Sequence, residues 1–325
     1  LHAKAMGPGV MGQLKAYSPD PLNPHNQNKQ QQCLSCHAPL KSQNKSLIAA
    51  ISGQKSTNLH QQGIICAACH VRNDHWFGPG PLPGVSKVAS TVKKGHQTST
   101  SHEAFKSAAF CATCHQFGDD DRKLEGKLLQ NTYVEWQNSV FAKQNISCQN
   151  CHMPGRRHQW QGIHSKAMVL KGLTLSAQLL SQISGQIKAK LGVINSGVGH
   201  YFPTYVTPRV VLQGYQQDKT GQMLEDTLVE EEIMRAVSMD LNDEYFDSRL
   251  PPGGQLVLDY QEPLDSQAAT MVLRIVVEPD FFYEQFNTAM LETDGKLLGR
   301  ELLKQAKDNA AKSAYVLFEK SFGLN

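Results

Sequence analysis

The chain of 325 residues is long enough for two domains, and its apolar fraction of 40% is ordinary for a soluble protein. Lysine and arginine (32) nearly balance aspartate and glutamate (29), which gives no argument for nucleic acid or a membrane surface as a partner. No apolar run approaches the roughly 20 residues that span a membrane. The sequence starts at Leu1 without an initiating Met, a basic segment or an apolar segment. We interpret it as a processed or trimmed form, so the lack of a signal peptide carries little weight.

All eight cysteines fall into four Cys-x-x-Cys-His motifs, at residues 33–37, 66–70, 111–115 and 148–152. Two thiols at this spacing can add across the two vinyl groups of one haem, and the next imidazole then faces the iron. The pattern predicts four covalently bound haem c groups. Their thioether ligands would be Cys33, Cys36, Cys66, Cys69, Cys111, Cys114, Cys148 and Cys151, and their proximal iron ligands His37, His70, His115 and His152.

Other uses of cysteine explain this pattern less well. Eight cysteines in an exported protein can form four disulfides, and Cys-x-x-Cys pairs also build zinc sites and redox-active dithiols. None of these sites needs a histidine directly after the second cysteine, and here it occurs four times. Because thioethers to haem form after export, the motifs predict a periplasmic, extracellular or cell-surface protein.

Nine further histidines are available as sixth ligands to the four irons, and this surplus favours bis-histidine coordination. Methionine is the usual competitor, but Met153 directly follows a proximal histidine and is interpreted as a packing residue. From local context, the candidate distal ligands are His2, His102, His158, His164 and His200. The other histidines are interpreted as surface or propionate-contacting residues: His25, His60, His75 and His96.

The chain changes character near residue 165. Residues 1–165 are rich in polar residues, glycine and proline, and we expect a tetrahaem domain of short helices and loops around stacked porphyrins. Residues 166–280 predict an antiparallel β-sandwich-like domain, with alternating apolar patterns at 173–180, 186–194, 209–215, 255–260 and 270–277. The segment 230–232, Glu-Glu-Glu, is interpreted as a solvated face. Helical spacing predicts a C-terminal helical segment over 281–325, with helix to about Phe322.

The haem half resembles multihaem cytochromes related to the tetrahaem electron acceptor of hydroxylamine oxidoreductase. The resemblance covers most of the first 215 residues. It rests on residues 33–39, 63–72, 110–117 and 148–154, on the His-Gln-Trp-Gln-Gly segment from His158, and on Gly-His-Tyr-Phe-Pro-Thr from Gly199. It implies mainly bis-histidine haems in closely stacked pairs. It adds weight to His2, His102, His158 and His200, and not to His164.

Two classes of function fit the motifs. The leading hypothesis is an electron carrier that is not an enzyme and exchanges electrons with redox proteins. The resemblance also extends to tetrahaem cytochromes that polymerise into extracellular filaments, in which copies of one chain would be the partners. The alternative is a periplasmic oxidoreductase of a small nitrogen or sulfur compound, which needs one open iron. No Cys-x-x-Cys-Lys site, the usual nitrite-reductase signature, is present. The β-rich domain could in addition dock a partner or a cell surface.

Overall fold

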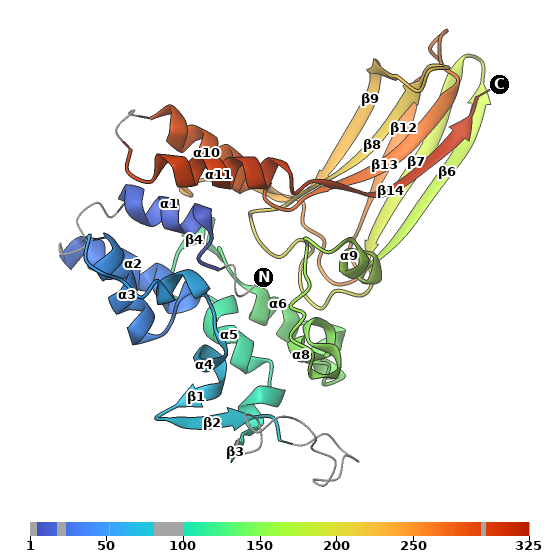
Figure 1. Ribbon diagram of the computed structural model, residues 1–325. Coiled ribbons are helices and arrows are strands. Elements are labelled where there is room, and N and C mark those ends of the chain that lie inside the picture. Colours follow the sequence, from blue (N-terminus) through green and yellow to red (C-terminus); the bar gives the residue numbers. More distant parts are fainter. Residues whose placement is uncertain (1–4, 18–23, 52, 81–99, 294–296, 325) are drawn as a thin grey trace. The chain divides into compact units, whose positions relative to one another are not determined.

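The computed structural model describes residues 5–17, 24–51, 53–80, 100–293 and 297–324 (Figure 1). The chain divides into two compact units. The first, called here the haem-motif unit, comprises Leu1–Gln116, Ile146–Trp160 and Ala289–Ala306. The second, called the β unit, comprises Phe117–Asn145, Gln161–Thr288 and Lys307–Asn325. The domain boundaries at residues 165 and 280 describe changes in sequence character and stay a prediction.

Short helices dominate the haem-motif unit, and four of them end on the histidine of a motif. Its helices are α1 (Pro8–Tyr17), α2 (Pro24–His37), α3 (Lys41–Ile51), η2 (Leu59–Gln62), α4 (Cys66–His70), η4 (Glu103–Lys106), α5 (Ala109–His115), α8 (Cys148–His152) and η5 (Pro154–Arg156). Helix α11 (Arg300–Ala311) begins in this unit.

The apolar core of the haem-motif unit is small. Its buried residues are Met6, Met11, Leu14, Leu34, Ala38 and Leu47. Helix α1 lies close against the start of α11 because Gly12 has no side chain. A Cβ at Gly12 would lie 2.8 Å from the Cδ2 atom of Leu303, which is too close for a real contact. Side chains alone therefore bury little apolar surface in this unit.

A tight hairpin follows the second motif directly. Strand β1 (Val71–Arg72) pairs antiparallel with β2 (His75–Gly78), and β2 pairs with the short strand β3 (Thr100–Ser101). The two turn residues, Asn73 and Asp74, have φ angles of 47° and 63°. Two successive positive φ angles are typical of a type I′ turn, which asparagine and aspartate tolerate well. The turn returns the chain to the histidine of its own motif.

Two antiparallel sheets form the β unit (Figure 1). One sheet has the order β12-β7-β6 and the other β14-β13-β8-β9. Their strands are β6 (Leu173–Ile183), β7 (Gln186–Asn195), β8 (Arg209–Gln217), β9 (Met223–Ile233), β12 (Gln255–Pro263), β13 (Thr270–Glu278) and β14 (Tyr315–Gly323). A two-stranded pair, β10 (Arg235–Val237) and β11 (Glu244–Asp247), accompanies them.

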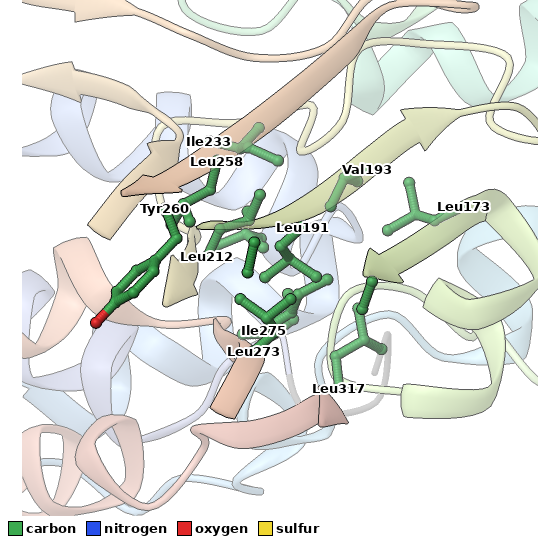
Figure 2. Close-up of a cluster of buried hydrophobic side chains, with 14 of the residues drawn as sticks. Leu173, Leu191, Val193, Leu212, Ile233, Leu258, Tyr260, Leu273, Ile275 and Leu317 are labelled. Carbon is green, nitrogen blue, oxygen red and sulfur yellow. The ribbon is translucent and has the colours of Figure 1, made fainter. Parts of the chain in front are cut away.

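Alternate residues of the strands fill the space between the two sheets (Figure 2). Strand β7 shows the pattern most clearly, because Ile187, Ala189, Leu191 and Val193 are buried while the residues between the first three are exposed. Such period-2 burial is expected where one face of a sheet packs on another sheet. The Tyr260 hydroxyl reaches the edge of this core and donates to the Thr227 carbonyl at 3.0 Å.

The segment before the fourth motif belongs to the β unit because a buried arginine holds it there. The segment contains the hairpin β4 (Lys123–Leu124) and β5 (Lys127–Leu128), and helices α6 (Thr132–Gln137) and α7 (Val140–Lys143). Arg235 on β10 is 1% exposed and donates to the carbonyls of Leu128 at 2.8 Å and Lys127 at 3.2 Å. Its Nε also donates to Glu244 at 2.8 Å. The charge is thus paired and its donors are used.

The fold is mixed helix and sheet with antiparallel sheets, as the sequence predicts. All five predicted strand segments coincide with strands, from β6 to β13. Strand β9 is not among the predicted strands, and the solvated face expected at 230–232 is confirmed for Glu230 and Glu231, which are exposed. These residues are part of an edge strand, and Glu232 pairs with Arg209 at 2.9 Å.

The C-terminal prediction holds for its helices and fails at its end. Helix α10 (Phe281–Glu292) and helix α11 form as expected, and α9 (Lys166–Gly172) precedes the first sheet. Residues 315–323 are strand β14 and not helix, because their apolar side chains pack into the sandwich beside β13. Among the described residues, no helix is both long and apolar enough to span a membrane.

Candidate haem attachment sites and axial ligands

Each of the four motifs lies on a helix that ends at the motif histidine. The first motif forms the end of α2 and the third the end of α5. The second and fourth motifs make up the whole of α4 and α8. In a helix, residues three apart lie on the same face, so the two thiols of each motif point to the same side. Helix α8, which carries the fourth motif, begins with a capping box, in which the Ser147 amide donates to Asn150 Oδ1 at 2.8 Å. The helical turn thus provides the geometry that two thioethers to one ring require.

The four motifs converge, with the third in the middle. The Cys111 thiol lies within hydrogen-bond reach of Cys148, and the Cys114 thiol within reach of Cys36. Cys69 is close enough to interact electrostatically with both Cys111 and Cys114. Gln149 on α8 also donates to the Ser107 carbonyl at 2.8 Å, just before α5. All four motifs therefore belong to one cluster in the haem-motif unit.

Most thiols of this cluster have a raised pKa, whereas the hydrogen bond from Cys111 lowers the pKa of Cys148. The hydrogen bond to Cys148 and burial raise the pKa of Cys111, and burial raises the pKa of Cys33, Cys69 and Cys151. None of the eight cysteines forms a disulfide. Within the described residues, no group of three or more acidic, cysteine or histidine side chains has the arrangement of a metal cluster. The thiols are thus neither paired in disulfides nor grouped with enough histidine or acidic side chains for a metal cluster in the part of the chain that the structure describes.

Two motif histidines have the tautomer that iron binding requires. The Nδ1 atom of His70 lies 2.8 Å from the Phe77 carbonyl, and that of His37 lies 2.6 Å from the Ala5 carbonyl. A carbonyl oxygen only accepts hydrogen bonds, so Nδ1 carries the proton and the lone pair lies on Nε2. The residues present therefore fit haem c, with eight thiols for attachment and imidazoles oriented by main-chain acceptors.

His158 is placed beside the second motif. The ring centroids of His158 and His70 are 5.9 Å apart, with an interplanar angle of 62°. Two imidazoles that face each other across one metal, each with a bond of about 2 Å, have ring centroids roughly 6 Å apart. Phe105 stacks on the His70 ring at 4.9 Å, and Trp160 lies 5.8 Å from the His158 ring. The separation of the two rings would thus allow His158 and His70 to bind one iron from opposite sides.

His102 is arranged differently. It precedes helix η4, and its Nδ1 accepts a hydrogen bond from the Ala104 amide at 3.2 Å. A neutral imidazole that accepts at Nδ1 carries its proton on Nε2. Binding of iron through Nε2 therefore requires that this hydrogen bond breaks.

His164 belongs to the β unit and is paired with an acid. Its Nε2 lies 2.9 Å from Oδ2 of Asp280, at the turn before α10. Close by, the Tyr315 hydroxyl donates to the Ile163 carbonyl at 2.6 Å. Both contacts join the residues just before α9 to later parts of the β unit. Of the candidates that the structure describes, His164 has the environment most typical of a structural residue.

His200 has the ligand tautomer. Its Nδ1 lies 2.8 Å from the Tyr201 carbonyl, so the lone pair lies on Nε2, as in His37 and His70. Gly199 permits this approach to α6 and α7, because a Cβ there would lie 3.2 Å from Trp136 and 3.4 Å from Phe141. The sequence motif around His200 thus forms a tightly packed loop.

The remaining histidines divide into three groups. His2 and His96 lie outside the described residues, and the side chain of His25 is not among those described. His75 is exposed on the β1–β2 hairpin. The surface interpretation is wrong for His60, which is 1% exposed; its Nδ1 pairs with Ser46 Oγ at 3.0 Å. Its buried Nε2 has no hydrogen-bond partner among the described residues.

The sequence comparisons find a distant relative. No protein-family model matches the chain. The chain is 24% identical over 172 residues to cytochrome c-552 of Aliarcobacter butzleri (strain RM4018), a match that covers 47% of this chain and 32% of that protein. The chain thus spans about a third of the length of the curated relative that it matches.

The structural comparison covers the whole fold. The crystal structure of a penta-heme cytochrome c552 from Thermochromatium tepidum matches with a TM-score of 0.65 and 17% identity. The match covers 99% of this chain and 93% of that chain. The chain therefore has the fold of that cytochrome. The structural neighbour is described with five haems, whereas the present sequence contains four motifs.

Proposed function

We propose that this chain is an exported multihaem c-type cytochrome that binds four haem c groups and transfers electrons between redox proteins. The observation that carries the proposal is the convergence of the four Cys-x-x-Cys-His helices in one unit. A carrier of this kind needs neighbouring haems close together, because electron transfer slows steeply with distance. Thiols of different motifs that lie within hydrogen-bond reach of each other meet this need.

The residues around the motifs have separate tasks in this proposal. When bound, haem supplies one-electron chemistry at its iron. The cysteines fix each ring covalently, and the motif histidines hold the iron from one side. Hydrogen bonds from His37 and His70 to main-chain carbonyls fix the ring orientation and raise the basicity of Nε2. Stronger donation to iron favours the oxidised state, so these irons are expected at low potential.

The proposed distal ligands are His2, His102, His158 and His200, with His164 as the weakest candidate. The separation of His158 from His70 and the tautomer of His200 support their places in this set. Bis-histidine irons are six-coordinate and closed to substrate, which fits an electron carrier that is not an enzyme.

The alternative is an oxidoreductase with one open haem that acts on a small nitrogen or sulfur compound. The hydrogen bond at Nδ1 of His102 and the pairing of His164 with Asp280 are the observations that favour it, because they occupy two candidate ligands. Carbon monoxide separates the two functions. We expect the reduced protein at neutral pH to bind no CO. Stoichiometric binding of one CO per chain would contradict the electron-carrier proposal and support the oxidoreductase.

Polymerisation into an extracellular filament is a narrower form of the same proposal, and it rests on the sequence resemblance. Electron microscopy of native protein at high concentration tests it directly. Regular fibres with one chain per repeat would support the filament, whereas uniform monomers would remove it and leave the electron carrier in place.

A further inference from the structure

The peptide group that joins His200 to Tyr201 is held at both ends by buried side chains. Its carbonyl, that of His200, accepts a hydrogen bond from Asn195 Nδ2 at 3.0 Å. Its amide, that of Tyr201, donates to Glu135 Oε2 at 3.0 Å. Asn195 is 1% exposed and Glu135 is 7% exposed. The orientation of this peptide is therefore fixed from two sides by groups that solvent does not displace.

Glu135 reaches the loop from a different part of the chain. It lies on α6, more than sixty residues before His200, and both residues belong to the β unit. Its Oε2 also accepts from the Thr204 hydroxyl at 3.0 Å, so one carboxylate oxygen spans the loop from residue 201 to residue 204. Because Nδ1 of His200 donates to the Tyr201 carbonyl, the position of Tyr201 also sets the direction of the imidazole.

A buried arginine holds the carboxylate in turn. Arg249 Nη1 lies 3.3 Å from Glu135 Oε1 and donates to the Thr204 carbonyl at 2.9 Å. Its other nitrogens form a two-point contact with Asp247, at 2.8 Å and 2.9 Å. The guanidinium also lies 5.1 Å above the Tyr201 ring. The chain of contacts thus runs from Asp247 through Arg249 to Glu135 and ends at the His200 loop.

Burial of two carboxylates and a guanidinium costs solvation energy, and a loop could be held by apolar packing alone. The network also borders a cavity of about 880 Å³, which Glu135, Asn195, Tyr201 and Arg249 help to line. The loop packs tightly on α6 and α7 at Gly199 but borders this cavity at Tyr201, and there the directional contacts to Glu135 and Asn195 fix it. Buried, paired charges therefore make sense here if the orientation of one side chain has to be fixed.

We propose that Glu135 and Arg249 are positioning residues that aim the His200 imidazole at a haem iron. The inference rests on the proposed function, in which His200 is a distal ligand. Glu135 acts through the Tyr201 amide and Arg249 acts through Glu135. The carboxylate also places a negative charge near the ligand, which favours the ferric state. Loss of this charge is therefore expected to raise the reduction potential of that haem.

The test compares three variants of the haem-loaded protein. Glu135→Ala removes the clamp, and Glu135→Gln keeps an acceptor for the Tyr201 amide but loses the charge. Glu278→Gln is the control, because Glu278 is a half-buried carboxylate of the β unit whose ion-pair partner is Arg209, outside the contacts that link Asp247, Arg249 and Glu135. Ferric EPR, CO binding and redox titration are measured on each. Far-ultraviolet circular dichroism of the whole protein, which reports its β-sheet content, confirms that each variant is folded.

For Glu135→Ala we expect one haem per chain to lose its low-spin EPR signal in part and to bind CO at least about tenfold more tightly than in the wild type. Glu135→Gln should show a smaller effect and a raised potential of one haem, and Glu278→Gln should show neither change. Wild-type spectra and CO affinity in folded Glu135→Ala would overturn the positioning role.

A fourth variant separates the inference from the function beneath it. His200→Gly should lose one low-spin haem, and added imidazole should restore the signal. If His200→Gly changes no haem, His200 is not a ligand and the positioning role falls with that assignment, while the other haems and the electron-transfer function are untouched. If His200→Gly changes one haem and Glu135→Ala changes none, only the positioning role fails.

Discussion

The haem-motif unit and the β unit are stabilised in different ways. In the described residues, the main apolar cluster of the haem-motif unit has six buried residues, and that of the β unit has nineteen. The cysteines of the first unit are exposed or half-buried, whereas the centre of the second is closed. Under the proposed function, porphyrin rings supply the apolar surface that side chains do not supply. The β unit needs no cofactor to complete its core.

The largest effect is expected when haem attachment is prevented. In chain produced without haem c maturation, the haem-motif unit should lose its fold, because six buried residues cannot offset the entropy of ordering it. The β unit should stay folded. Limited proteolysis followed by mass spectrometry measures both at once, with fully matured protein as the control. If both units resisted proteolysis equally without haem, the haem-motif unit would not need haem to fold, which would contradict this prediction.

A cavity in the β core should have the next largest effect and should spare the haem spectra. Leu191 is 0% exposed at the centre of the sandwich, so Leu191→Ala is expected to lower the free energy of unfolding of the β unit by about 2–5 kcal/mol. The control is Leu180→Ala on the edge strand β6, at a side chain that is 50% exposed, with an expected change below about 0.5 kcal/mol. Denaturation followed by circular dichroism gives both values, and similar losses for the two variants would refute the assignment of the core.

The ion pairs of the β unit should make it sensitive to acid. Burial opposes ionisation of Asp247, but hydrogen bonds from Arg249 and Lys127 outweigh it and lower the pKa of Asp247 from 3.8 to about 2. A lowered pKa stabilises the fold above the unfolded value, and the contribution is lost as pH falls from about 4 to about 2. The shift corresponds to about 2 kcal/mol.

Asp247→Asn checks this contribution. The variant should be less stable at neutral pH and should show a smaller loss of stability between about pH 4 and pH 2. Urea denaturation at a series of pH values measures the slope. An unchanged slope in the variant would mean that Asp247 is not the group responsible.

The smallest effect concerns the pair of His164 and Asp280. Because the His164 side chain is more than a third exposed, its loss should cost at most about 1 kcal/mol. His164→Asn should leave all haem spectra unchanged, whereas His158→Asn should convert one haem to high spin. The rings of His158 and His70 are inclined by 62°, so the low-spin EPR signal of that haem should be more anisotropic than parallel rings would give. Loss of a low-spin haem in His164→Asn would return His164 to the ligand set.

Local rules were sufficient for much of this structure. Alternation of apolar residues located five strands of the β unit, because a half-buried strand has a side-chain period of two. Strand β14 could not be found in this way, because its apolar residues continue the helical spacing of the preceding helix α11. Only the pairing with β13 makes this segment a strand. The motif spacing predicts the attachment residues for a similar reason, because the pattern reflects chemistry within one helical turn.

Residues that act across the fold gave no local signal. Glu135 is an ordinary polar residue in the sequence, and only the folded β unit brings it to the Tyr201 amide. The buried His60 forms a hydrogen bond with Ser46, fourteen residues earlier, and the partner of His164 lies 116 residues away. A histidine can be counted from sequence, but its tautomer and its partner depend on the tertiary structure.

The most direct test of the central claim is peptide mass mapping of protein matured in a host that attaches haem c. The account predicts four haem-bearing peptides from this chain, one for each of residues 33–37, 66–70, 111–115 and 148–152, with both cysteines of each modified. Unmodified cysteines in any of these peptides, in protein that carries haem elsewhere, would contradict the tetrahaem assignment.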